Sequence, residues 1–233
     1  MQREECYVAF LDILGFKSII EKKPSIPEEI FRIIRDTRSQ LEREKSIEDI
    51  DDEWPEMFNN MLIRIMSDSI VIAVAEKHRD SLAFVVYASS ILQSKLLEMK
   101  ILLRGGISKG WMCWDDEITY GAGMVKAYEL ENEACFPRII IPGKVITEYV
   151  KLVKTSSIIY VTDYLLKDSD GWYYCKQYLN NADSDLASWV TEKLWDENTK
   201  DSVRDKYVWL RDKISSPDDE AEPERDFAEL LEK

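Results

Sequence analysis

Two aspartates, Asp12 and Asp68, each follow a strongly apolar segment and precede residues that favour a turn. Asp12 lies near the end of the run CYVAFLDIL, which stops at Gly15, and Asp68 separates two β-prone runs at 61–66 and 70–75. An acid is costly in apolar surroundings unless it is paired or binds a cation, so such positions often carry function. If the two segments are neighbouring antiparallel strands, both carboxylates meet at one edge of a sheet.

A pair of carboxylates at one edge of a sheet can share divalent metal ions. Magnesium and manganese prefer oxygen ligands of this kind. Two such ions about 4 Å apart can activate a hydroxyl and neutralise a triphosphate during in-line attack on phosphorus. Taken singly, Asp12 is better explained as the end of a strand and Asp68 as an Asx turn. Their joint placement favours the two-metal interpretation.

The apolar periodicity of the chain predicts the elements that would position these acids. We expect a buried strand over 6–14, a helix over 25–44 and a hairpin over 61–75, followed by a helix from about 80 to 100 and a strand at 101–108. This β-α-β-β-α-β order is typical of a ferredoxin-like, α+β fold. The remaining predictions are a loop at 47–55, a helix within 120–134, and strands at 138–141, 156–162 and 171–179.

The composition predicts one compact core with an appendage. A chain of 233 residues that is 45% hydrophobic can bury one good core and has little left for a second domain. We expect the core over 1–165, and a hairpin and helical extension over 166–233 that ends in an acidic tail. The tryptophans Trp189, Trp195 and Trp209 are expected to dock this extension.

The charge balance limits the possible partners. The chain has 31 Lys and Arg against 45 Asp and Glu, a net charge of −14, which disfavours binding to a nucleic acid. The charge of a single nucleoside triphosphate can be met locally by magnesium and a few basic side chains. The four cysteines are scattered without a C-x-x-C pair, and no apolar run approaches the roughly 20 residues that span a bilayer. We therefore expect a soluble, cytoplasmic protein without nucleic acid or membrane partners.

Four blocks of sequence resemble the motifs of one enzyme family. The run FLDILGF at 10–16 is similar to the metal-binding F-x-D-I-x-G-F motif of class III nucleotidyl cyclases, and SDS at 67–69 stands where that family has its second metal acid. LRGGISKG at 103–110 resembles the family's R-x-G-I-x-x-G, and 121–131 has the spacing of its G-x-x-x-N-x-A-x-R-x-E segment. The blocks follow the family order over roughly residues 7–141.

The resemblance implies a fold, a metal site and an assembly. A class III cyclase core has the βαββαβ order, and its site would hold two divalent ions, Mg²⁺ or Mn²⁺, on Asp12, Asp68 and the Ile13 carbonyl. Enzymes of this family are head-to-tail dimers with pockets between the subunits, so a homodimer is implied. The residues expected close to the substrate phosphates are Leu14, Gly15 and Phe16.

Two positions depart from the family pattern. Val125 and Glu129 stand where the family has its transition-state Asn and Arg, and neither can donate to a phosphate. The expected substitutes are Arg104 and Lys126 in catalytic roles and Arg138 in substrate binding. The sequences SDSI, RGGIS and AYELE resemble those of the bacterial pyrimidine cyclases of Pycsar anti-phage defence, which depart from purine cyclases at similar positions.

Arg64 is the candidate for recognising the base. It precedes Asp68 by four residues on the same face of a strand, which corresponds to about 13 Å. The resemblance places a base-selecting residue here, and an arginine can donate to the O2 and N3 edge of a pyrimidine. The alternative is a solvated Arg or one paired with a nearby acid. Tyr120 is a second candidate, stacking on or hydrogen-bonding the ring.

Three hypotheses follow for function. The first is an enzyme that converts UTP or CTP to a 3′,5′-cyclic monophosphate, a second messenger for a separate effector in anti-phage defence. The second is a purine cyclase, and the third is a non-catalytic nucleotide-binding dimerisation module, which Val125 and Glu129 keep open. A hydrolase triad is disfavoured, because the single histidine, His78, lies in a polar turn and is expected to face solvent.

Overall fold

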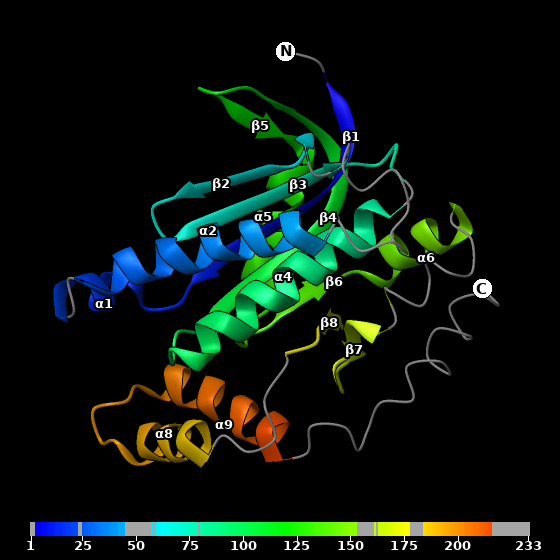
Figure 1. Cartoon of the computed structure of the whole chain (residues 1–233). Helices are drawn as coiled ribbons and strands as arrows, with labels where there is room; N and C mark the ends of the chain where they lie inside the picture. Colours follow the sequence, from blue (N-terminus) through cyan, green and yellow to red (C-terminus); the bar gives the residue numbers. More distant parts are fainter. Residues whose placement is uncertain are drawn as a thin grey trace.

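The chain folds around one mixed β-sheet with helices on both faces (Figure 1). The eight strands follow the order β2-β3-β1-β4-β6-β8-β7, with β5 paired to β4 outside that path. All pairs are antiparallel except β4 with β6. The computed structural model describes residues 3–22, 25–44, 57, 59–78, 80–152, 161, 163–177 and 184–215.

The centre of the sheet is built by β1 (Glu4–Ile13), β3 (Ser69–Ala75) and β4 (Leu103–Trp114). β2 (Leu62–Met66) forms the outer strand beside β3. Both faces of β1 and β3 are buried, because two helices cover one face of the sheet and a third helix covers part of the other. This explains why their sequences are nearly continuous apolar runs rather than alternating ones.

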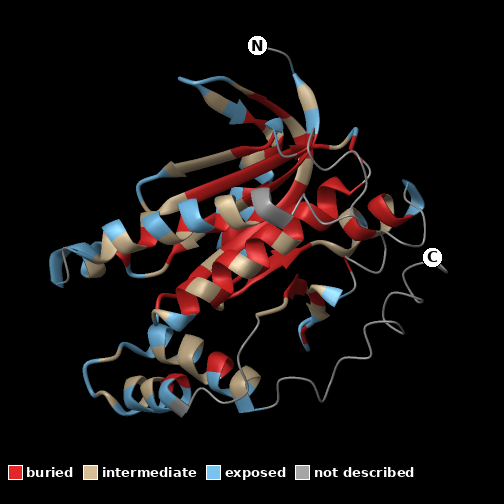
Figure 2. Ribbon diagram, viewed as in Figure 1, coloured by how far each residue is buried: buried red, intermediate tan, exposed pale blue. Residues whose placement is uncertain are grey.

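Side-chain alternation along β1 separates two parts of the core. Tyr7, Ala9 and Leu11 pack with α2 (Ile26–Glu44) and α4 (Ser81–Glu98) in the largest apolar cluster. Cys6 and Val8 point to the opposite face, where they meet α5 (Ala122–Glu133). The buried sheet and the inner side of α4 stand out in Figure 2.

Glycine in β4 allows α5 to lie directly on the sheet. A Cβ on Gly106 would collide with Leu130 and would lie 2.7 Å from the carbonyl oxygen of Ala127. Gly110 meets the backbone of Gly123 in the same way, at 2.8 Å for an added Cβ. Gly106 and Gly110 of the RGGISKG block therefore serve helix-to-sheet packing, and they set the distance between α5 and β4.

Other elements complete the two ends of the sheet. They are α1 (Phe16–Lys22), β5 (Thr119–Gly121), β6 (Ile139–Ile141), α6 (Gly143–Leu152), β7 (Leu165–Lys167), β8 (Tyr173–Cys175), α8 (Ser184–Trp195) and α9 (Asp201–Ser215). None of the helices in the described part of the chain combines the length and apolar character needed to cross a bilayer.

α8 and α9 lie together at one end of the sheet (Figure 1). The Trp209 ring stacks on Phe136 with centroids 5.8 Å apart, and its indole N–H donates to Asp168 at 2.8 Å. Trp189 packs edge-on against Tyr207 of the neighbouring helix. Trp195 is 81% exposed, so the prediction that it docks the extension is wrong.

The predicted α+β class and βαββαβ order are confirmed. β4 runs six residues beyond the predicted end at 108, and α1, α6 and β5 were not predicted. His78 is buried at 5% exposure, so the prediction that it faces solvent is wrong. The predicted loop at 47–55 and the acidic tail from 216 lie outside the described residues, as does most of the predicted strand at 156–162.

The division of the chain at residue 165 remains a proposal. β7 and β8 pair with each other and with β6, so they continue the sheet beyond that residue. α8 and α9 then follow as a separate pair of helices that contact each other.

Candidate functional site

Asp12 and Asp68 lie at the same end of the sheet. Asp12 is the last residue of β1 but one and faces Ser69 of β3 across the ladder. Asp68 belongs to the two-residue turn between β2 and β3. The backbone N–H of Ile13 donates to the carbonyl of Asp68 at 2.9 Å, which fixes the hairpin tip against the end of β1. The hairpin and the strand thus bring together two acids that are 56 positions apart.

Arg104 and Glu131 complete this end of the sheet on the side of α5. Arg104 is the direct partner of Asp12 in the β1–β4 ladder, and its guanidinium forms an ion pair with the carboxylate of Glu131. Glu131 belongs to α5 and is only 3% exposed. Arg104 was predicted to act in catalysis; here its charge is engaged by Glu131, so it positions this corner of the site.

The electrostatics of the corner are dominated by negative charge at Asp12. Burial, together with the nearby carboxylates of Glu131 and Asp68, raises the pKa of Asp12 from its ordinary value of 3.8 to about 6. Arg104 and Lys206 oppose the shift but do not cancel it. A half-buried acid with an elevated pKa beside a second acid is a frequent sign of a functional site.

The donor set fits a divalent metal ion. Two carboxylates with an uncompensated negative charge at Asp12 offer the hard oxygen ligands that Mg²⁺ and Mn²⁺ prefer. Among the residues that the structure describes, no group of three or more His, Cys, Asp or Glu gathers to hold a metal. The fit therefore depends on the Asp12 and Asp68 pair, together with backbone oxygens such as that of Ile13 and with the substrate itself.

The loop after β1 carries the residues expected near the phosphates. Gly15 has a φ of +76° and no atom within 4 Å of an added Cβ, so the chain turns there with its backbone open. The backbone N–H of Leu14 donates to the carbonyl of Leu102 at 2.9 Å and is therefore already engaged. The Phe16 side chain points into the main apolar cluster and is 7% exposed. Any phosphate contact from this loop would therefore come from backbone near Gly15.

Arg64 lies on β2 and reaches the β4–β5 hairpin. Its Nη2 donates to the carbonyl of Asp115 at 2.6 Å and to that of Asp116 at 3.4 Å. Tyr120 belongs to the same hairpin, where it is 47% exposed and meets the Trp111 ring edge-on at 5.9 Å. Both base-reading candidates are thus associated with one hairpin, and the hydrogen bonds of the Arg64 guanidinium to described residues go to backbone carbonyls.

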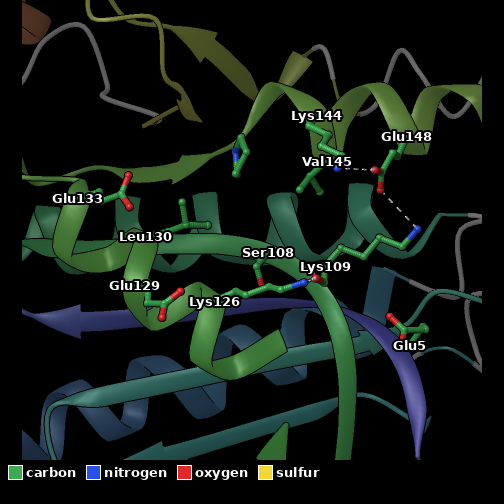
Figure 3. A pocket seen from close by; sticks show the side chains of 11 residues that line it. Glu5, Ser108, Lys109, Lys126, Glu129, Leu130, Glu133, Lys144, Val145 and Glu148 are labelled. Carbon is green, nitrogen blue, oxygen red and sulfur yellow. Dashed lines mark hydrogen bonds and ion pairs between the residues drawn. The ribbon is translucent and has the colours of Figure 1, made fainter. Parts of the chain in front are cut away.

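Lys126 lies in a different region from the acid pair. Its ammonium donates to the carbonyl of Lys109 at 3.2 Å, beside a cavity of about 470 Å³ between α5 and α6 (Figure 3). Lys109 faces Tyr7 in the ladder whereas Arg104 faces Asp12, a separation of five strand residues or about 16 Å. Within one chain, Lys126 is not brought to the acids.

Arg138 is also not brought to the acid pair. It is 1% exposed, and its guanidinium forms ion pairs with Asp168 at 2.5 Å and with Asp170. Its Nε donates to the carbonyl of Ala134 at 3.2 Å. These contacts hold the turn between β7 and β8 against the end of α5. Each nitrogen of the Arg138 guanidinium thus donates to a group of the chain itself and not to a substrate.

Two residues near the site were not predicted, Glu131 and Lys206. Glu131 was visible as the last acid of the AYELE block, but its pairing with Arg104 depends on how closely α5 lies on β4. Lys206 belongs to α9, and its charge acts on Asp12, Arg104 and Glu131. No local signal could show that a helix almost 200 residues after Asp12 returns to it.

The comparisons with known proteins find structural relatives only. No protein-family model matches the sequence, and neither does any curated protein. The adenylyl cyclase CyaB from P. aeruginosa is 13% identical with a TM-score of 0.43, covering 77% of this chain and 97% of the other.

Two further solved structures are similar at the same level. An adenylate/guanylate cyclase/hydrolase from Silicibacter pomeroyi is 14% identical with a TM-score of 0.46, covering 75% of this chain and 98% of that one. A bacterial light-regulated adenylyl cyclase is 13% identical with a TM-score of 0.42, covering 75% and 90%.

Proposed function

We propose that the protein is a nucleotidyl cyclase that converts a pyrimidine nucleoside triphosphate, UTP or CTP, to its 3′,5′-cyclic monophosphate. The observation that carries the proposal is the junction of β1 with the β2–β3 turn, where the Ile13-to-Asp68 hydrogen bond brings Asp12 and Asp68 to one corner. The raised pKa of Asp12 supports a cation at this corner, since an unneutralised acid there is unfavourable.

The metal ions would be held by Asp12, Asp68 and the Ile13 carbonyl. When bound, they supply activation of the 3′ hydroxyl and neutralisation of the phosphates. The chain's own contribution is positional. The Arg104–Glu131 pair holds α5 at the site end of β4, opposite Asp12, and the open turn at Gly15 offers backbone to the phosphates.

Base selection is assigned to Arg64 and Tyr120. Arg64 stands on the same strand face as Leu62 and Met66, four residues before Asp68. Its present partners are neutral carbonyls of an exposed hairpin, which a pyrimidine edge can replace at little electrostatic cost. Pyrimidine use and a signalling role in phage defence through a separate effector are supported by the sequence resemblance.

A homodimer is part of the proposal. Val125 and Tyr128 of α5 are 54% and 51% exposed, and Ile118 and Tyr120 near β5 are 51% and 47% exposed. Large apolar side chains left at the surface in such numbers favour contact with another chain. A second subunit would also offer its own Lys126 to the acid pair, which the Lys126 of the same chain does not reach. Light scattering at several concentrations tests the assembly.

The test of activity uses all four nucleoside triphosphates. Purified protein with Mn²⁺ is incubated separately with UTP, CTP, ATP and GTP, and cyclic products are separated by chromatography. We expect a cyclic pyrimidine product that Asp12→Asn or Asp68→Asn abolishes. Asp116→Asn, a change of the same kind at an exposed hairpin position, is expected to leave it unchanged. A preference for ATP or GTP would replace the pyrimidine assignment with a purine one.

A second candidate is a nucleotide-binding module without turnover. It is favoured by the positions of Val125 and Glu129, which are exposed on α5 where a donor to the transition state is expected. This candidate predicts that the protein binds a triphosphate, that Asp68→Asn weakens the binding, and that no cyclic product forms at any protein concentration.

A further inference from the structure

α9 docks on the core through one face. Trp209 and Leu210 are 8% and 0% exposed, and Lys206 and Lys213 lie on the same side at helical spacings of three and four residues. Lys213 donates to Asp168 at 3.0 Å, so the C-terminal half of this face is anchored by the same acid that pairs with Trp209.

The docked face of α9 lies at the site end of the sheet. Trp209 and Leu210 share an apolar cluster with Leu102, which precedes β4, and Leu14 and Leu130 pack against the same cluster. Leu14 follows Asp12 by two positions, and Leu130 is adjacent to Glu131. In Figure 1, α9 accordingly lies below the end of the sheet at which α4 finishes and β4 begins.

Lys206 differs from the basic side chains near it on this helix. Neighbouring basic groups are all engaged: Arg204 donates to the carbonyls of Leu194 and Thr199, and Lys213 pairs with Asp168. Lys206 is half-buried and forms no hydrogen bond or ion pair with a residue that the structure describes. Its ammonium is not among the buried polar atoms that lack a partner, so it keeps contact with water and is open to an anionic ligand.

The surroundings of Lys206 are those of the site corner. Burial and the charge of Arg104 lower the pKa of Lys206, whereas Asp12, Cys135 and Glu131 raise it. Of these acids, Glu131 is already paired with Arg104. The Lys206 ammonium therefore lies close enough to Asp12 for the two charges to interact, but it does not form an ion pair with that carboxylate.

We propose that Lys206 of α9 is a substrate-binding residue that contacts the phosphates of the nucleoside triphosphate beside the Asp12 and Asp68 corner. The inference rests on the proposed function and deepens it, because α9 supplies in the same chain a cation that α5 lacks at Val125 and Glu129. An ammonium is a compact point charge well suited to phosphate oxygens. It also gives the α8–α9 pair a role in the site.

The experiment measures binding of inorganic tripolyphosphate in the presence of Mn²⁺ to the full chain by calorimetry, which removes the base from the comparison. Lys206→Gln is compared with Lys206→Arg, which keeps the charge, and with Lys200→Gln, the same change at an exposed position just before α9. Binding of Mn²⁺ alone and the thermal unfolding midpoint are measured for each variant.

We expect Lys206→Gln to weaken tripolyphosphate binding about tenfold or more, the loss of one charge-assisted hydrogen bond. Lys206→Arg should stay within about threefold of the parent and Lys200→Gln should equal it. Parent-like tripolyphosphate binding by Lys206→Gln overturns the inference. So does tighter Mn²⁺ binding by that variant, which would make Lys206 a competitor of the metal. A parent protein that binds Mn²⁺ but no triphosphate contradicts the proposed function itself.

Discussion

Arg104 of β4 and Glu131 of α5 form a largely buried ion pair at the strand position that faces Asp12. The pair joins the helix to the sheet at the site corner. It also occupies the one guanidinium that could otherwise neutralise Asp12 directly across the β1–β4 ladder. The pairing of Arg104 with Glu131 thus leaves Asp12 available for a metal.

Glu131→Ala is expected to lower the free energy of unfolding by about 3 kcal/mol, because it leaves the Arg104 charge partly buried without its partner. The freed guanidinium should then turn to Asp12 and weaken Mn²⁺ binding by about tenfold. Urea unfolding and calorimetry measure the two effects. Glu133→Ala, an exposed change on the same helix, should alter stability by less than about 0.5 kcal/mol. Equal stability of the two variants would contradict the structural role of the pair.

Asp12→Asn is expected to stabilise the metal-free protein at neutral pH while removing its metal site. The pKa of Asp12 is raised from 3.8 to about 6, so the folded chain holds this proton more tightly than the unfolded chain. Ionisation of Asp12 therefore costs stability as the pH rises from about 4 to about 6, and the full cost is present above that window. The variant should melt above the parent at pH 7.5, and the difference should shrink at pH 4.

Scanning calorimetry with and without Mn²⁺ measures this difference. Mn²⁺ should raise the melting temperature of the parent and leave that of Asp12→Asn unchanged, because a ligand stabilises only the state that binds it. Asp116→Asn serves as the exposed control at every pH. A parent whose stability increases between pH 4 and pH 6 more than that of Asp12→Asn would show that the Asp12 pKa is not raised.

The core of the fold was predictable because its signals are local. The apolar run that ends at Asp12 and the β2–β3 hairpin at Asp68 are visible within a few residues, and each is observed close to its predicted limits. β4 was predicted to stop at 108 because three glycines and Lys109 lower the β propensity of this segment. Two of those glycines, Gly106 and Gly110, are required by α5, a contact that lies outside any local window.

The charged residues of the site were harder to place for the same physical reason. Whether a basic side chain can bind a substrate depends on its partners in the fold. Arg138 forms ion pairs with Asp168 and Asp170, which lie 30 and 32 positions further along the chain. Conversely, Lys206 reaches the site corner only because Trp209 docks α9. Tertiary contacts of this kind have no periodicity that a sequence could display.

Gly106→Ala is expected to destabilise the protein by about 2 kcal/mol through overpacking. The added Cβ would collide with Leu130 and with the Ala127 carbonyl, both on α5, so the helix must move away from β4. The same movement should weaken the Arg104–Glu131 pair at the site corner. Urea unfolding measures the loss, and a change smaller than about 0.5 kcal/mol would mean that α5 does not lie this close to the sheet.

Arg64→Met separates two roles that the structure allows for Arg64. If Arg64 reads the base, the variant should lose about tenfold or more in kcat/KM for its pyrimidine substrate. The kcat/KM for ATP and GTP should not fall by the same factor. If Arg64 only braces the hairpin through the Asp115 and Asp116 carbonyls, turnover of every triphosphate should fall in proportion. Tripolyphosphate binding should stay unchanged in the first case, since Arg64 precedes Asp68 by four residues, about 13 Å along the strand from the proposed metal and phosphate site. Arg32→Ala, an exposed arginine on α2, is the matched control, and a pyrimidine preference that survives in Arg64→Met would remove Arg64 from base recognition.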